Sequence, residues 1–182
     1  AGKVKIKIVD SAYLAIEELK KNIKTLPVDC VKTDTNTGLV NESFKSLIVG
    51  FGDTGLEAFN FLYEHATFVG PDKKKTPFSC FAIDEKMNSM AGLIRTKMPA
   101  IKEDELTLIQ ATVDSEEFWI NVRDIMPELN YVVVCMNDDE AGLTLAVNLF
   151  KYALKTRTAE QPQLRIMLRC YDSSNEESME MV

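Results

Sequence analysis

The sequence lacks the features of several common protein classes. Its 21 Lys and Arg residues are outnumbered by 28 Asp and Glu residues, and the net charge of -7 argues against binding to nucleic acid or to an anionic membrane. No apolar run approaches the roughly 20 residues that a membrane-spanning helix needs. The opening stretch, AGKVKIKIVDSAYL, has neither an initiator Met nor the apolar segment of a signal peptide. We therefore expect a processed chain or a piece of a longer protein.

Cysteine and histidine are also scarce. Cys30, Cys80, Cys135 and Cys170 are far apart, and no C-x-x-C or Cys/His cluster occurs. We expect reduced cysteines, mostly in the core, in a cytoplasmic protein without a disulfide or zinc site. The single histidine, His65, is expected near the C-terminal end of a helix, where it interacts with the helix dipole or with solvent.

Apolar runs alternate with amphipathic segments from Phe44 onward. The runs predict five strands, separated by segments of helical periodicity. This order predicts a doubly wound, mainly parallel α/β sheet of the Rossmann type, with helices on both faces and right-handed crossovers. The expected strands are KSLIVGF, FSCFAID, ELTLIQATV, YVVVCMN and LRIMLRCYD, and the expected helices are TGLEAFNFLYEHA, KMNSMAGLIRTKM, SEEFWINVRDIMPEL and DEAGLTLAVNLFKYALKTR.

The composition divides the chain into three parts. Residues 1–43 contain a strand-like run, VKIKIVD, a helical stretch, SAYLAIEELKKNIK, and a short strand-like run, VDCVKTD. They form either an extra β-α-β unit on the sheet or the tail of a preceding domain. Residues 44–172 form the Rossmann-type domain, in which the lysine-rich loop 70–77 is expected to be solvated. The acidic residues 173–182 are expected to fray or to begin a truncated helix.

A glycine-rich turn follows the first strand of this domain. Gly50-Phe51-Gly52-Asp53-Thr54-Gly55 has the G-x-G-x-x-G spacing between a predicted strand and a predicted helix, as in a dinucleotide-binding turn. Gly50 permits the tight turn, Gly52 the approach of a pyrophosphate, and Gly55 close packing of helix against strand. The helix N-terminus offers N–H groups and a positive dipole end to the anion. The alternative is a turn that joins strand to helix and binds nothing.

Acidic residues bear on this site in two ways. Asp53 either caps the helix amides that a phosphate would use or points outward. Asp84, followed by Glu85, ends the second strand of the domain and is expected to accept hydrogen bonds from ribose hydroxyls, which favours NAD over NADP. Lys86 reduces that preference. The alternative role for Asp84 is to cap the next helix.

Four segments together resemble the TrkA-N (regulator of K⁺ conductance, RCK) nucleotide-binding domain. They are SLIVGFGDTG, FAIDEK, LIQATVDSEEFW and YVVVCMNDDEAGLTLAVNLFKYAL, and the resemblance covers about residues 44–172. It implies a ligand-sensing domain that binds NAD(H) or another adenine nucleotide, forms dimers and gates a channel or transporter. We expect a homodimer whose contact includes the apolar helix over residues 143–154. The partner would be a membrane transporter or another domain of the full-length protein.

The resemblance also assigns residues to the ligand. Ala111 and Thr112 would border the adenine, and Met136 and Asn137 the far end of the ligand. Gln110 stands where the family has Asp, which is a departure at the adenine contact. The full implied set is Gly50, Phe51, Gly52, Asp53, Thr54, Gly55, Asp84, Glu85, Ala111, Thr112, Met136 and Asn137.

Motifs for catalysis are missing from the sequence. No G-x-S-x-G, H-E-x-x-H or P-loop occurs. Asp138, Asp139 and Glu140 are expected to cap and charge the last helix rather than to hold a metal or act as a base. We therefore favour a regulatory nucleotide-binding domain without hydride-transfer activity. The alternatives are an NAD-dependent oxidoreductase fragment that lacks its catalytic domain and a ligand-free Rossmann interaction domain.

Overall fold

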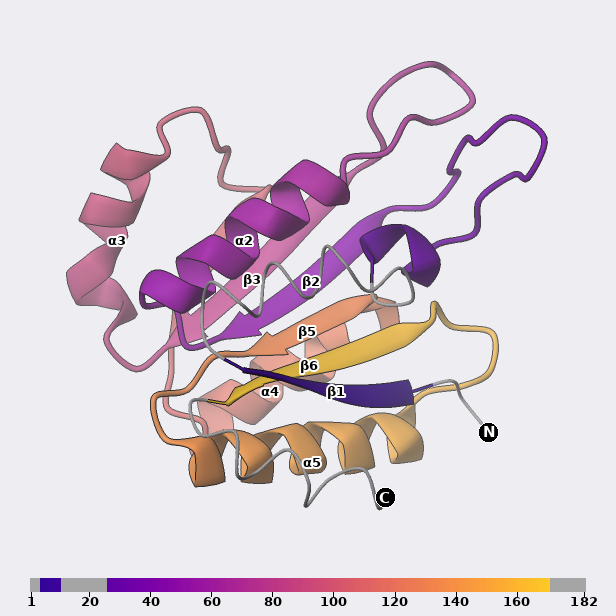
Figure 1. The fold of residues 1–182 in the computed structure, drawn as a ribbon. Coiled ribbons are helices and arrows are strands. Elements are labelled where there is room, and N and C mark those ends of the chain that lie inside the picture. The colour runs from indigo at the N-terminus through magenta and orange to yellow at the C-terminus, as the bar shows by residue number, and fades with distance from the viewer. Residues whose placement is uncertain (1–3, 11–25, 171–182) are drawn as a thin grey trace.

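The computed structural model describes residues 4–10 and 26–170 (Figure 1). Its centre is one six-stranded sheet in which every strand runs parallel to its neighbours, in the order β1-β6-β5-β2-β3-β4. The strands are β1 (Val4–Asp10), β2 (Phe44–Val49), β3 (Phe78–Asp84), β4 (Leu106–Gln110), β5 (Tyr131–Val134) and β6 (Leu164–Cys170). The predicted Rossmann-like α/β fold is confirmed.

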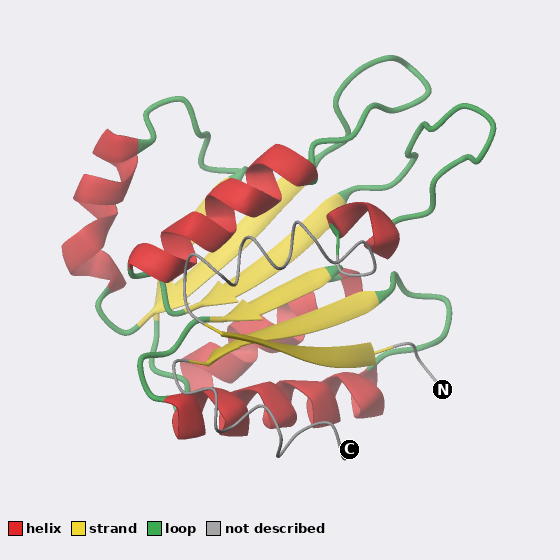
Figure 2. Cartoon of the chain, viewed as in Figure 1, coloured by secondary structure: helices red, strands yellow, loops and turns green. Residues whose placement is uncertain are grey.

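Helices cover both faces of the sheet (Figure 2). On one face lie α2 (Asp53–His65) and α3 (Met87–Lys97), and on the other lie α4 (Glu116–Ile125) and α5 (Asp139–Thr156). Two 3₁₀ helices, η2 (Pro27–Cys30) and η3 (Met126–Glu128), precede β2 and β5. Each face of the sheet therefore has its own buried apolar cluster.

The apolar runs are continuous because the strands are buried on both sides. In β2, Leu47 and Val49 belong to the cluster beneath α4 and α5, whereas Ile48 belongs to the cluster beneath α2. All three are at most 2% exposed. This alternation follows from the period of two in a strand, and it explains why Leu47, Ile48 and Val49 are all apolar although they face opposite sides of the sheet.

The N-terminal strand is part of the same sheet. β1 pairs in parallel with β6 in the register Val4↔Leu164 to Asp10↔Cys170, at one edge. The helix expected over residues 11–24 lies outside the described residues. The strand expected in VDCVKTD is wrong, because Pro27–Cys30 forms a 3₁₀ helix and only an isolated bridge, Thr33↔Val40, follows it. Pro27 fixes its own φ and has no N–H group for a strand ladder, which favours the turn.

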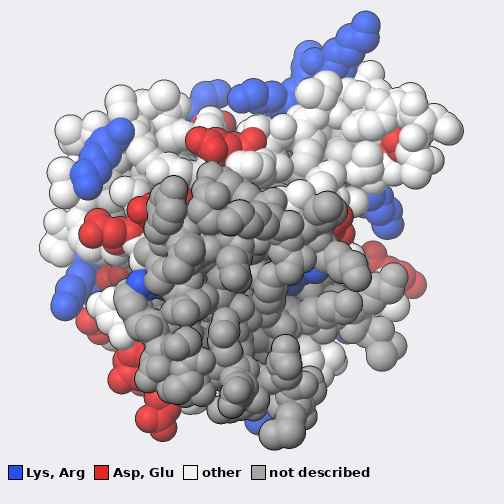
Figure 3. All heavy atoms as spheres, viewed as in Figure 1, with Lys and Arg blue, Asp and Glu red and all other residues white. Residues whose placement is uncertain are grey.

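Two exposed loops lie side by side at the amino ends of β2 and β3. The backbone N–H of Val40 donates to the carbonyl of Val69 at 3.0 Å, which joins them. Residues 71–75 are exposed, and Lys73 adopts a left-handed conformation with φ 61°. Figure 3 shows basic side chains protruding from this end of the molecule, while acidic ones gather where α5 begins. The lysine-rich loop is therefore at the opposite edge of the sheet from the glycine turn.

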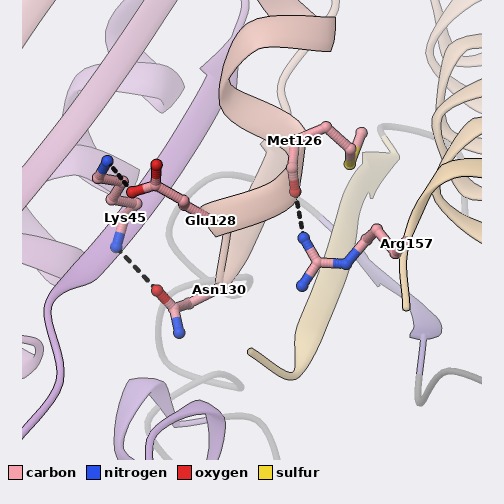
Figure 4. A network of polar contacts seen from close by, with 5 residues as sticks. All are labelled: Lys45, Met126, Glu128, Asn130 and Arg157. Atoms are coloured by element: carbon pink, nitrogen blue, oxygen red, sulfur yellow. Dashed lines mark hydrogen bonds and ion pairs between the residues drawn. The ribbon is translucent and has the colours of Figure 1, made fainter. Parts of the chain in front are cut away.

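A buried polar residue, Asn130, joins three segments at the amino edge of the sheet (Figure 4). Its side-chain Oδ1 accepts from the Lys45 N–H at 2.9 Å, and its Nδ2 donates to the Cys30 carbonyl at 3.1 Å. Its backbone N–H donates to the Lys45 carbonyl at 2.8 Å, and its carbonyl accepts from the Arg165 N–H at 3.0 Å. Asn130 thus connects η2, β2 and β6.

Charged side chains surround this junction. The Lys45 ammonium pairs with Glu128, and the Arg157 guanidinium donates to the backbone carbonyls of Met126 and Pro162. These contacts hold the end of α5 against η3 and the loop before β6. The charges at this edge therefore support the fold.

Candidate functional site

The strand order reverses at β2. From β2 the chain adds β3 and β4 on one side, then returns to place β5 on the other side. In open α/β sheets, ligands bind outside the carboxyl ends of the strands at such a reversal. The glycine turn that follows Val49 lies at this point, so the fold brings the predicted motif to the expected edge.

Two of the three glycines in the turn are required by the fold. Gly50 has φ +84°, and a Cβ added to it would lie 2.4 Å from the Cys135 carbonyl oxygen. A Cβ on Gly55 would lie 2.2 Å from the Gly50 carbonyl oxygen. Both contacts are with backbone and are far below normal contact distance. These glycines permit β5, the turn and α2 to pack together, as the spacing predicts.

Gly52 has no such requirement. Its φ is -67°, and nothing lies within 4 Å of an added Cβ. It is the exposed N-cap residue of α2, and no side chain in the described structure caps that helix. The absence of a side chain at Gly52 therefore leaves open space beside the N-terminus of α2 without serving the internal packing.

The neighbouring turn residues divide between the core and the surface. Phe51 is buried and packs edge-on against Phe59, with ring centroids 6.4 Å apart, so only its backbone faces the turn. Asp53 is the exposed first residue of α2 and does not cap it, which decides between its two predicted orientations. Thr54 is half-buried in the same turn of helix.

Asp84 has a role that the sequence did not predict. One carboxylate oxygen accepts from the Phe51 N–H at 2.8 Å, and the other accepts from the Lys86 N–H at 2.8 Å. The carboxylate is therefore fixed between the glycine turn and the segment that starts α3. Asp84 is not the N-cap of α3, because that position is Lys86. Glu85 is exposed, with its carboxylate 3.8 Å from the Lys86 ammonium.

The residues after β4 form the next part of the edge. Ala111 is buried, and its N–H donates to the Asp84 carbonyl at 3.3 Å. Thr112 is exposed, and its carbonyl accepts from the hydroxyl of Ser115 at 2.7 Å. Gln110 accepts from the Asn88 N–H at 2.8 Å, so it caps α3 from a neighbouring strand. Sequence reasoning missed this role because no local motif signals a cap so far away in the chain.

The residues after β5 lead into α5. Met136 is half-buried and packs against the cluster beneath α4 and α5, while Asn137 is exposed. Asp138 caps α5 by accepting from the Ala141 N–H at 2.9 Å, which confirms its predicted role. His65 lies in the last turn of α2, as predicted, and its Nδ1 is 2.9 Å from the Phe61 carbonyl oxygen.

Arg169 is a second residue that sequence reasoning missed. It lies near the carboxyl end of β6 and is only 6% exposed. Burial lowers its pKa, while the carboxylates of Asp139 and Glu57 favour its charged form. The arginine therefore places a positive charge near the first turns of α2 and α5. An arginine inside the apolar run LRIMLRC is a sequence signal for such a residue.

Cys30, Cys80 and Cys135 are buried and free. Burial raises the pKa of Cys135, which follows β5, to about 12, and also raises the pKa of Cys80 to about 12. Burial raises the pKa of Cys30 to about 11, although Arg165 opposes this. All three are therefore protonated thiols at neutral pH, with little nucleophilic character.

Residues 4–10 and 26–170 contain no group of three His, Cys, Asp or Glu side chains suited to a metal ion. None of their helices combines the length and apolar character needed to cross a bilayer. A cavity of about 370 Å³ lies between α4 and α5, beside Trp119 and Glu140, and another of about 330 Å³ lies at the amino edge beside Asp29 and Arg157. Neither is lined by the glycine turn, so the candidate site is defined by the turn and the strand ends.

The predicted site residues all lie at the carboxyl edge of the sheet, but they are not all in direct contact. The glycine turn and Asp84 are joined directly by a hydrogen bond, whereas Ala111 is linked to Asp84 only through the backbone. Comparisons with protein-family models, curated proteins and solved structures give no match to this chain.

Proposed function

We propose that the chain is a regulatory domain that binds NAD(H) or another adenine nucleotide at the glycine turn. The proposal rests mainly on Gly52. The packing of the protein does not require a glycine at this position, whereas the close approach of a phosphate would require one. The N-terminus of α2 supports it, because its first N–H groups and its positive dipole end face the same space without a side-chain cap.

Asp84 supports the ribose part of the proposal. A carboxylate offers about four lone-pair positions, and the hydrogen bonds to Phe51 and Lys86 use two of them. Two ribose hydroxyls would use the others without breaking either bond. Asp84 is therefore held in place before the ligand arrives.

A regulatory role fits this site better than catalysis. Around the turn, Asp84 is fixed by two N–H groups, Cys135 is a protonated thiol, and the Asp53 and Glu85 carboxylates are exposed to solvent. The output would pass to an attached domain or to a cation transport system, and the domain would act as a homodimer in the cytoplasm. These last features rest on the resemblance of the sequence to RCK domains.

Gly52→Val is expected to abolish nucleotide binding while the fold is kept. The valine side chain would occupy the space that a pyrophosphate needs beside α2, and nothing in the protein would clash with it at Cβ. Calorimetric titration with NAD(H), ADP and ATP measures the effect. We expect at least about a hundredfold loss of affinity, equivalent to about 2.7 kcal/mol.

Gly92→Ala is the matched control for this experiment. Gly92 is an exposed glycine in α3 with nothing within 4 Å of an added Cβ. The alanine should raise the stability of the middle of α3 by up to about 1 kcal/mol. Because Gly92 lies beyond the first turn of α3, the variant should change nucleotide affinity far less than Gly52→Val. Wild-type protein that binds none of these nucleotides at millimolar concentration would refute the proposal.

The wild-type protein is expected to prefer NAD to NADP. A 2′-phosphate would approach the Asp84 carboxylate, and like charges about 4 Å apart cost about 1–4 kcal/mol, or roughly tenfold to several-hundredfold in affinity. Asp84→Ala should weaken NAD binding and reduce the ratio of the affinity for NAD to the affinity for NADP. The ratio is the useful measurement, because the variant also removes the hydrogen bond to the Phe51 N–H and so weakens the site for both cofactors.

Glu85→Gln is the control for the cofactor preference. Glu85 is exposed beside Asp84 and pairs only with the exposed Lys86 ammonium at 3.8 Å. Removal of the Glu85 charge should change the ratio of the affinities for NAD and NADP much less than Asp84→Ala does. Equal affinity of the wild-type protein for NAD and NADP would remove Asp84 from the binding site.

A ligand-free interaction domain is the second candidate. Asp53, Asp84 and Glu85 surround the glycine turn with negative charge, and a phosphate would have to overcome their repulsion. The same titrations decide between the candidates, because a ligand-free domain binds none of the nucleotides.

A further inference from the structure

The helices at the carboxyl edge differ in how their N-termini are capped. Ser115 caps α4 by accepting from the Phe118 N–H at 3.1 Å, and Asp138 caps α5 by accepting from the Ala141 N–H at 2.9 Å. Each of these caps belongs to its own helix. The N-cap residue of α3, Lys86, makes no side-chain cap bond.

The start of helix α3 is instead hydrogen-bonded to the ends of two strands. Asp84 at the end of β3 accepts from the Lys86 N–H, and Gln110 at the end of β4 accepts from the Asn88 N–H, both at 2.8 Å. Asp84 and Gln110 are register partners in the sheet. The first turn of α3 is thus attached to the edge where the nucleotide is proposed to bind.

Few side chains of α3 are buried. Only Met87 and Ile94 are buried, Leu93 is 60% exposed, and Arg95 donates to the Leu106 carbonyl at 2.7 Å. By contrast, α5 buries five residues, including Leu145 and Leu149. A helix with few buried apolar contacts opens locally at lower free energy than the core does. The hydrogen bonds at its first turn therefore have a large share in fixing α3.

We infer that helix α3 reports whether the nucleotide site is occupied. The inference rests on the proposed function, because it requires a ribose at Asp84. The Lys86 N–H helps to hold the Asp84 carboxylate where ribose hydroxyls would bind it, so opening of the first turn of α3 would release the carboxylate and weaken the ligand contact. The first turn of α3 becomes more stable when the ligand is bound, and by linkage a stable first turn favours the ligand.

Amide hydrogen exchange followed by NMR, with and without saturating ADP, tests this inference. Exchange at Lys86 and Asn88 is expected to slow by about tenfold or more, because opening of the first turn then requires loss of the ligand contact. The amides of Phe118 and Ala141 serve as internal controls, since their caps are independent of Asp84. They should change by less than about twofold.

Reciprocity gives a second measurement. Gln110→Ala removes the acceptor for the Asn88 N–H. If the coupling holds, the variant should weaken by about fivefold the binding of ADP and also of ribose 5-phosphate, which has no adenine for Gln110 to contact. Asn121→Ala removes a side-chain hydrogen bond on α4 that has no contact with the proposed site, and it should leave ADP binding unchanged. In the Gln110→Ala variant the Asn88 amide should exchange rapidly with or without ADP.

The outcomes separate the two proposals. If calorimetry shows ADP binding but the exchange of Lys86 and Asn88 stays constant, the inference about α3 is wrong and the nucleotide site stands. If no nucleotide binds, the proposed function is wrong and the inference is overturned with it.

Discussion

Gly50→Ala is expected to destabilise the protein by about 2–5 kcal/mol. An alanine at φ +84° adopts a left-handed conformation, which costs about 1–2 kcal/mol. Its Cβ would also lie 2.4 Å from the Cys135 carbonyl oxygen. That oxygen is backbone, so β5 and the turn must move apart, which costs about 1–3 kcal/mol or more. Urea unfolding at 25 °C measures the loss, provided that the slope of the transition is unchanged.

Two other glycines separate the causes of this effect. Gly38 has φ +70° but open space around an added Cβ, so Gly38→Ala carries only the conformational cost. Gly52 has neither a positive φ nor a close neighbour, so Gly52→Ala should cost about 1 kcal/mol or less, as a lost glycine N-cap. An equal loss in Gly50→Ala and Gly38→Ala would show that the contact with Cys135 has no energetic weight.

Asn130→Ala is expected to destabilise the protein by about 2–4 kcal/mol. The side chain is fully buried, and its removal leaves the Lys45 N–H and the Cys30 carbonyl without their partners. Each buried polar group that loses its hydrogen bond costs about 1–3 kcal/mol. The same urea transition measures the effect. The whole protein should be destabilised and not only the start of β5, because the Asn130 side chain connects η2 to β2.

Asn121→Ala is the matched control. The amide of Asn121 donates to the Glu117 carbonyl at 2.8 Å on the exposed surface of α4, where water can replace it. This variant should change the free energy of unfolding by about 0.5 kcal/mol or less. If Asn130→Ala has an equally small effect, water fills the space left by the amide and Asn130 is not a structural junction.

The fold was predictable from the sequence because its signals are local or periodic. Each buried strand is a continuous apolar run, and each helix between strands has the spacing of an amphipathic segment. The strand Phe78–Asp84 agrees with its predicted bounds in full. The failure at Pro27–Cys30 shows the limit of such reasoning, because a short run with alternating apolar residues also fits a 3₁₀ turn.

The candidate site was predictable only in part. The glycine spacing located the turn and the requirement for Gly50 and Gly55, but it did not distinguish them from Gly52. That distinction depends on how close a Cβ added to each glycine would lie to the backbone of Cys135 or Gly50. The contacts of Asp84 and Gln110 were not predictable either, since they join residues that meet only when neighbouring strand ends align.

The position of β1 has a consequence for the order in which the protein folds. β1 is synthesised before the other five described strands, yet its only partner in the described sheet is β6, which is synthesised after them. β1 therefore stays unpaired, with its backbone groups hydrated, until the strands from β2 to β6 have assembled. Contacts between segments so distant in the chain form slowly because of the entropy of loop closure. The edge beside β6 is thus completed late, and until then β6 is open to pairing with another chain.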